Sequence, residues 1–110
     1  MLDKTKAKEI AQKYSEEVRK ILDPVSVILF GSYVNGNPHE WSDIDVAVLV
    51  DNVKDDDWYD TCTLLHKIRW DKDKTADFLD IEPHLLDQNY DPSGFVEHVV
   101  KTGEVIYKSA

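Results

Sequence analysis

The segment VSVILFGSYVNGNPHEWSDIDVAVLV, residues 25–50, decides the fold of this chain. It opens with VSVILF (25–30) and closes with IDVAVLV (44–50), two short and almost wholly apolar runs that are rich in β-branched residues. Such runs are typical of strands buried on both faces. Between them, residues 31–43 are rich in turn formers, with Asn35-Gly36 as a clear turn signal. The segment therefore predicts two core strands joined by a loop.

Helices are predicted on both sides of this segment. Residues 5–22 place apolar side chains on one helical stripe, and Pro24 prevents the helix from continuing. An acidic loop, 51–57, leads into a second helix at about 58–70, for which Asp57 is a candidate N-cap. The first stripe consists of Ile10, Tyr14, Val18, Ile21 and Leu22, and the inward face of the second helix of Trp58, Cys62, Leu65 and Ile68.

The C-terminal part predicts two further strands and a helix. The segment DFLDIEP (77–83) indicates a third strand, weakened by the acids that alternate within it. Asp91 and Pro92 are typical of a helix cap and first turn, and Gly103 of a helix end. Residues 104–107 add a short edge strand, and the inward side chains of the last helix are Phe95, Val96, Val99 and Val100. The order α-β-(turn)-β-α-β-α-β predicts one α/β (α+β) domain over residues 1–110.

Composition narrows the class of protein. The net charge is −9, with 22 acidic residues against 13 Lys and Arg, so direct binding to nucleic acid is not expected. Such a chain suits cations, metal-bound nucleotides or a basic protein partner, although simple solubility also explains the charge. No apolar run reaches the roughly 18 residues of a membrane span, and the opening residues 1–6 do not predict a secretory signal. With Cys62 as its single cysteine, the chain is predicted to be cytoplasmic, without a membrane partner.

Two acids stand at the start of the second strand. Side chains alternate along a strand, so Asp43 and Asp45 are predicted on one face, about 7 Å apart. Ala47 and Leu49 continue that face with apolar side chains, which places the acids at the rim of the sheet. Two carboxylates at a partly buried rim favour a divalent cation between them. Alternatively, Asp43 caps a turn and Asp45 is a solvated residue.

Gly31-Ser32 follows the first strand directly, where an α/β sheet presents its carboxyl end to ligands. Glycine lets the backbone approach a phosphate closely, and the Ser32 hydroxyl and nearby amides can donate to phosphate oxygens. A helix beginning at Ser32 would add its N-terminal dipole. Alternatively, Gly31 only turns the chain and Ser32 caps.

Gly31-Ser32 and the acids together form the pattern G-S-x10-D-x-D between two buried strands. With Phe30, Gly36 and SDIDVAV (42–48), it resembles the minimal nucleotidyltransferase (MNT) family of the DNA polymerase β superfamily. The resemblance implies a nucleotidyltransferase fold, with a small mixed sheet flanked by helices. It also implies an enzyme in which Gly31 and Ser32 bind the triphosphate of ATP or another NTP. Asp43, Asp45 and a third acid would coordinate two Mg²⁺ ions.

The third acid is expected on the strand 77–83. Asp80 and Glu82 share one face of that strand, and Asp77 and Leu79 the other. Many short members of the family carry Ile-Glu-Pro here, which matches residues 81–83, so Glu82 is preferred as catalytic residue and metal ligand. Asp80 is the alternative, and both acids could instead be solvated residues of an edge strand.

The chain departs from the family beside the phosphate segment. Members often carry a basic residue directly after Gly-Ser or before the next glycine, where this chain has Tyr33 and Asn35. Fewer cations neutralise a triphosphate less well, which predicts slow turnover or an altered nucleotide preference. Nearby, Trp41 either stacks on a base or covers a core edge, and His84 either lies near the rim or packs.

The resemblance also implies a partner. Small MNT proteins commonly act with a HEPN-domain protein, as the antitoxin of a toxin–antitoxin pair, and are thought to adenylylate a tyrosine of the toxin. A net charge of −9 suits a basic partner of this kind. The alternatives are an inactive binding protein of the same fold that neutralises its partner by contact, and a small-molecule nucleotidyltransferase. A homo-oligomer is a further alternative.

Overall fold

A four-stranded sheet with the strand order β3-β2-β1-β4 forms the centre of the molecule. The computed structural model describes residues 3–36, 38, 43–51, 53, 55–70 and 76–109. β1 runs antiparallel to both β2 and β4, whereas β2 and β3 are parallel, so the sheet is mixed as predicted. β4 is an edge strand, also as predicted. The strands span Ser26–Phe30 (β1), Ile44–Val50 (β2), Ile81–Asp87 (β3) and Glu104–Lys108 (β4).

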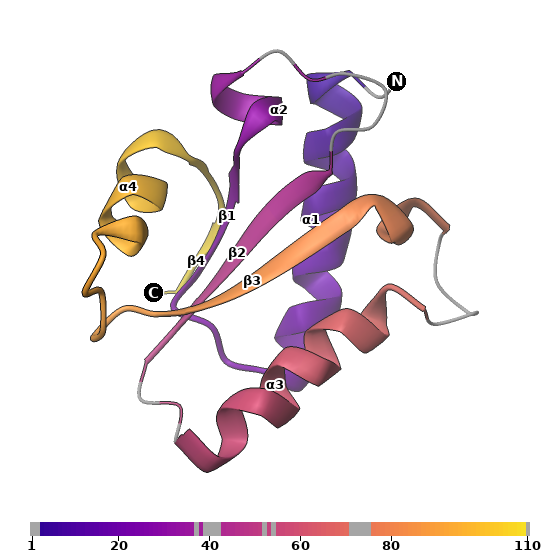
Figure 1. The fold of residues 1–110 in the computed structure, drawn as a ribbon. Coiled ribbons are helices and arrows are strands. Elements are labelled where there is room, and N and C mark those ends of the chain that lie inside the picture. Colours follow the sequence, from indigo (N-terminus) through magenta and orange to yellow (C-terminus); the bar gives the residue numbers. More distant parts are fainter. Residues whose placement is uncertain are drawn as a thin grey trace.

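Two helices, α1 (Lys4–Ile21) and α3 (Asp55–Ile68), cover one face of the sheet (Figure 1). The side chain of Asp3 caps α1 by accepting a hydrogen bond from the amide of Lys6 at 2.7 Å. The predicted stripe of α1, apart from Ile21, and the inward face of α3 pack into the main core. This core includes Ile10, Tyr14, Val18, Val27, Leu29, Ile44, Val46, Val48, Leu65, Ile81 and Leu85.

A shorter helix, α4 (Phe95–Thr102), packs on the opposite face against β1. Its Val99 joins Ile28, Phe30 and Ala47 in a second, smaller cluster of buried side chains. The Asp91 carboxylate accepts hydrogen bonds from the amides of residues 96 and 97, at 2.9 and 3.0 Å. Gly103 ends the helix, as predicted. The two faces are therefore covered unequally, because α4 has only eight residues.

Several predicted boundaries and orientations are wrong near helix ends. Ile21, the last residue of α1, is 46% exposed rather than buried. α3 begins at Asp55, so Asp57 lies within its first turn and is not the N-cap. α4 begins only at Phe95, and its side chains Phe95 and Val100 are substantially exposed. A short helix at a sheet surface buries one narrow stripe, which Val99 occupies here.

The third strand is also shifted from its prediction. Residues 76–80 form a 3-10 turn, and β3 begins at Ile81, where pairing with Ile44 of β2 starts. Asp80 therefore precedes the strand. The prediction that Asp80 and Glu82 share one strand face is wrong. None of the helices in the described ranges is long and apolar enough to cross a membrane.

Candidate active site

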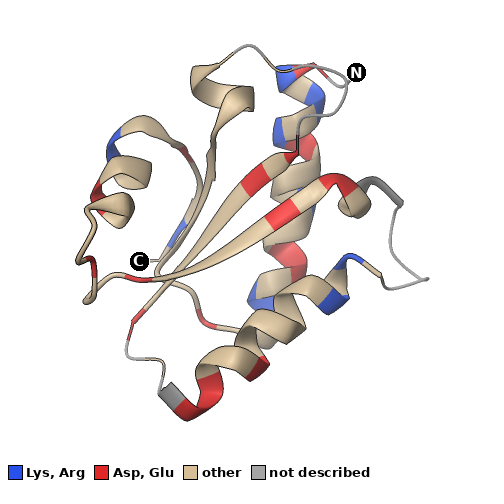
Figure 2. Cartoon of the chain, viewed as in Figure 1, with Lys and Arg blue, Asp and Glu red and all other residues tan. Residues whose placement is uncertain are grey.

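The end of β1 and the starts of β2 and β3 meet at one rim of the sheet. In the antiparallel pair, Phe30 lies opposite Asp45, and in the parallel pair Asp45 lies beside Glu82. Gly31 follows β1 directly, so three predicted site residues, Gly31, Asp45 and Glu82, converge here. Figure 2 shows the acidic segments on β2 and β3 side by side at the same end of the sheet.

The acids face the less covered side of the sheet. Ile44, Val46 and Val48 point into the main core, so the alternation of a strand turns Asp45 and Ala47 to the side of α4. Laterally paired residues point the same way, which puts Glu82 on that side too. Asp45 and Glu82 are both half-buried, so each carboxylate is reachable from solvent yet held by the strand.

Gly31 is required by the position of Asp45. Its φ of 82° and ψ of −151° lie in a region of backbone conformation that is essentially restricted to glycine. A Cβ atom at this position would stand 3.3 Å from Cγ of Asp45 and would collide with Oδ2. The missing side chain therefore leaves room for the carboxylate against the backbone.

A short helix, α2 (Ser32–Asn35), begins directly after Gly31. The amides of Val34 and Asn35 donate to the carbonyl of Gly31 at 3.0 and 2.9 Å, whereas the first amides of a helix have no intrahelical acceptor. The Ser32 side chain is half-buried beside them. Gly31 and Ser32 thus offer backbone and hydroxyl donors at the rim that holds Asp45, as a phosphate-binding segment requires.

The other two candidate acids lie around the same helix. Asp43 directly precedes β2, and Asp80 directly precedes β3; both are exposed. Burial raises the pKa of the Tyr33 phenol, and the charges of Asp80 and Asp43 raise that pKa further. Both carboxylates therefore act on one side chain of α2. Of the four acids, only Asp45 and Glu82 are direct neighbours in the sheet.

Both departures from the family pattern have structural partners. Tyr33 is 4% exposed and belongs to the main core. The Asn35 side chain donates from Nδ2 to the backbone oxygen of Thr102 at 3.0 Å, which joins α2 to the end of α4. These two positions therefore hold the fold together and supply no positive charge to the site.

His84 lies at the rim rather than in the core. Its Nε2 is 3.0 Å from Oδ1 of Asp45, and the two side chains are 32% and 27% exposed. Its ring also contacts Phe30 edge-on, with centroids 5.0 Å apart. Trp41, which was predicted either to stack on a base or to cover a core edge, lies outside the described residues.

The donor chemistry of the rim fits a hard divalent cation. Mg²⁺ prefers carboxylate oxygens, and Asp45 and Glu82 present them from adjacent strands. Across the described parts of the chain, no three His, Cys, Asp or Glu side chains are already gathered around one cation position. The carboxylate side chains at the rim would therefore have to move closer together to coordinate an ion.

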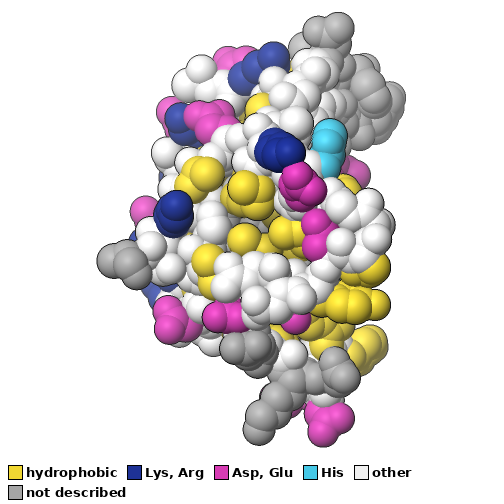
Figure 3. All heavy atoms as spheres, turned by 90° about the vertical axis from the view of Figure 1, so that its left-hand side faces the viewer, with side chains coloured by type: hydrophobic (Ala, Val, Ile, Leu, Met, Phe, Trp, Pro, Cys, Tyr) yellow, Lys and Arg dark blue, Asp and Glu magenta, His cyan; other side chains and the backbone are white. Residues whose placement is uncertain are grey.

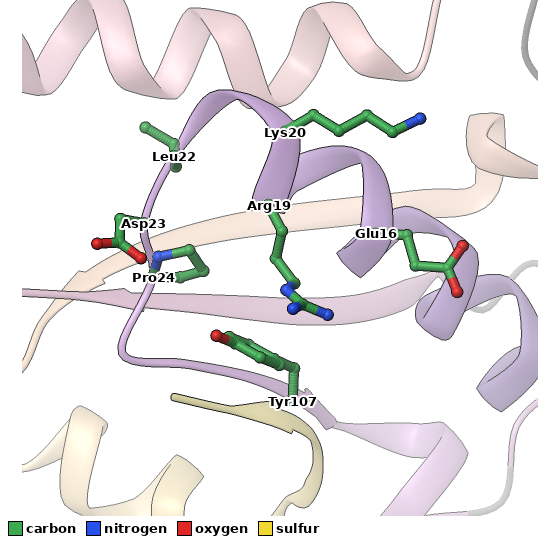
Figure 4. A pocket seen from close by; sticks show the side chains of 7 residues that line it. All are labelled: Glu16, Arg19, Lys20, Leu22, Asp23, Pro24 and Tyr107. Carbon is green, nitrogen blue, oxygen red and sulfur yellow. The ribbon is translucent and has the colours of Figure 1, made fainter. Parts of the chain in front are cut away.

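A separate pocket lies at the far end of β1 from this rim. It has a volume of about 330 Å³ and lies between the end of α1 and β4. The guanidinium of Arg19 stacks over the ring of Tyr107, 3.9 Å from its centroid (Figure 4). Tyr107 pairs with Val27 near the start of β1, whereas Asp45 pairs with the last residue of that strand. This pocket is not part of the acidic site.

Comparison with known proteins agrees with the geometry. The model of the family described as polymerase beta, nucleotidyltransferase, matches residues 5–110. A Methanocaldococcus jannaschii protein, named as a proposed protein adenylyltransferase, is 28% identical over 100 residues, covering 91% of this chain and 92% of the relative. Two solved structures have the same fold. One is an assigned nucleotidyltransferase from Sulfolobus solfataricus, with 19% identity, a TM-score of 0.64 and coverage of 96% of this chain and 83% of that chain. The other contains a tri-AMPylated Shewanella oneidensis HEPN toxin in complex with an MNT antitoxin. The matched chain is 22% identical, with a TM-score of 0.55, and the match covers 93% of this chain and 73% of that chain.

Proposed function

The chain belongs to the polymerase β nucleotidyltransferase family, and from this premise we propose that it transfers AMP from ATP to a hydroxyl group of a partner protein. One observation carries the proposal: the Asp45 carboxylate lies against the side-chain-free Gly31 and beside Glu82. A triphosphate held at Gly31 and Ser32 would therefore stand directly over the acids.

Each residue of the rim has a role in this proposal. The amides and hydroxyl of Gly31 and Ser32 would bind the triphosphate, and Asp43, Asp45 and Glu82 would hold two Mg²⁺ ions. The ions would supply charge neutralisation at the α-phosphate and lower the pKa of the attacking hydroxyl. The hydroxyl oxygen forms a bond to the α-phosphorus, the bond from that phosphorus to the pyrophosphate breaks, and Glu82 accepts the hydroxyl proton.

A protein is the acceptor that the observations support best. The relative from Methanocaldococcus jannaschii is named for transfer to protein, and the Shewanella oneidensis complex holds a toxin that carries AMP groups. The chain's charge of −9 disfavours nucleic acid and suits a basic partner, for which a HEPN-type toxin is our candidate. The side of the molecule that bears α4 gathers hydrophobic side chains near its middle, with acidic and basic ones around them, which offers a partner apolar and charged contacts (Figure 3).

A second candidate function is neutralisation of the partner by contact alone. Two observations favour it: Tyr33 is buried in the core and Asn35 is bonded to α4, so neither position brings a cation to the phosphates. The small-molecule transferase stays a prediction from sequence, since no feature of the described residues favours it.

Transfer of a label distinguishes the two candidates. The protein is mixed with α-³²P-ATP, Mg²⁺ and the protein encoded beside it, and labelled products are separated by gel electrophoresis. We expect label on the partner, and loss of that label with the variant D43N/D45N or with EDTA. Tight association of the two proteins without label, measured by calorimetry, would instead establish the contact mechanism. GTP, CTP and UTP in parallel reactions give the base preference.

A further inference from the structure

Both oxygens of the Asp45 carboxylate have defined neighbours. Oδ1 lies 3.0 Å from Nε2 of His84, and Oδ2 occupies the space that a Cβ atom at Gly31 would take. An ionised carboxylate can only accept hydrogen bonds, so the imidazole must donate from Nε2. The hydrogen bond from β3 and the space left free by Gly31 therefore define the position of this carboxylate at the rim.

The imidazole is itself held in place. Its strand position is set by the pairing of His84 with Ala47, and its ring meets Phe30 at an interplanar angle of 63°. Phe95, the first residue of α4, contacts Phe30 with centroids 5.8 Å apart and lies 6.5 Å from the imidazole. Three rings from β1, β3 and α4 thus form one cluster, which holds Nε2 at Asp45.

We propose that His84 is a positioning residue, which orients the Asp45 carboxylate for cation binding through the Nε2–H···Oδ1 hydrogen bond. The inference rests on the proposed function, because it takes Asp45 as a cation ligand. Partners that hydrogen-bond to metal ligands fix the ligand's orientation, and their removal typically lowers metal affinity about 10–100-fold. Phe30, whose ring contacts the imidazole, directly precedes Gly31, the first residue of the proposed phosphate-binding segment.

Two substitutions separate the hydrogen bond from the packing. In H84L the side chain keeps an apolar volume between the rings but has no donor, whereas in H84Q an amide can donate from a similar position. H98L makes the same change at an exposed histidine of α4 and is the matched control. Binding of Mn²⁺ to the full chain, with a non-hydrolysable ATP analogue present, is measured by electron paramagnetic resonance of the free ion. Thermal unfolding confirms that each variant is folded.

We expect H84L to bind Mn²⁺ about 10–100-fold more weakly than the wild type, with H84Q and H98L close to the wild type. Equal affinities of H84L and wild type would overturn the inference, and so would equal losses in H84L and H84Q, which would mean a packing role. Tighter binding by H84L would overturn it too, since His84 would then compete with the ion. D45N separates the two proposals: if it binds Mn²⁺ as the wild type does, the proposed cation site itself fails.

Discussion

Glu82 lies directly beside Asp45 in the parallel pairing of β2 and β3, and both side chains face the side of the sheet that α4 only partly covers. Neighbouring strands are about 4.8 Å apart, so two carboxylates in this register can share one cation. Asp80 lies before the strand, in the 3-10 turn, and is exposed. The register therefore favours Glu82 over Asp80 as the third acid.

The first prediction compares these two acids. We expect E82Q to lower the rate of AMP transfer by about 100-fold or more, because it removes both a cation ligand and the proposed proton acceptor. D80N should lower the rate far less, since that carboxylate is not aligned with Asp45. Initial rates of label transfer at saturating ATP measure both effects. A larger loss in D80N than in E82Q would assign the role to Asp80.

The second prediction concerns Gly31. G31A should lower the free energy of unfolding by about 1–3 kcal/mol, because alanine is strained at this φ and ψ, and it should abolish AMP transfer by displacing Asp45. Gly94 is the matched control, since its φ of 78° is also positive but a Cβ there would meet nothing within 4 Å. G94A should be destabilised by about 1–2 kcal/mol and retain its activity. Urea unfolding and transfer assays test the pair, and an active G31A would refute the role of the close approach.

The third prediction tests the bond between α2 and α4. The Asn35 side chain donates to the carbonyl of Thr102, the last residue of α4. N35A should lower the free energy of unfolding by about 0.5–1.5 kcal/mol through loss of this bond. N35D should lower the free energy of unfolding further, because it places a negative charge at the negative end of the helix dipole. Urea unfolding at pH 7 ranks the variants. An N35A as stable as the wild type would show that the bond does not contribute, and an N35D as stable as N35A would show that the charge at the helix end has no effect.

The central strands and the family could be predicted from the sequence because their signals are local. β2 spans residues 44–50, the bounds that its apolar run predicts, and the Gly31-Ser32 and Asp43/Asp45 pattern identified the family that the comparisons confirm. A continuous β-branched run between turn signals has few other conformations open to it. The apolar stripe of α1 around Tyr14 is also a local signal, and it could be predicted for the same reason.

The start of β3 and the environment of His84 could not be predicted, since both depend on pairing between distant segments. The acids within residues 77–83 do not mark where the strand begins; that is set by the register of Ile81 with Ile44. His84 reaches Asp45 only through this register. The one available signal was its spacing of two from Glu82, which places both side chains on one strand face.

The fourth prediction concerns Tyr14, whose hydroxyl donates to the carbonyl of Leu65 at 2.6 Å inside the main core. Burial raises the pKa of this phenol well above its ordinary value of 10.0. The folded state therefore holds the proton more tightly than the unfolded state, so the contribution of Tyr14 to stability is constant below pH 10 and is lost as the pH rises above it. Above pH 10, the free energy of unfolding should fall with a slope up to about 1.4 kcal/mol per pH unit steeper in the wild type than in Y14F. Y59F, at an exposed tyrosine, is the control and should keep the wild-type slope. Urea unfolding from pH 8 to pH 11 measures the slopes, and equal slopes in the wild type and Y14F would contradict the assignment.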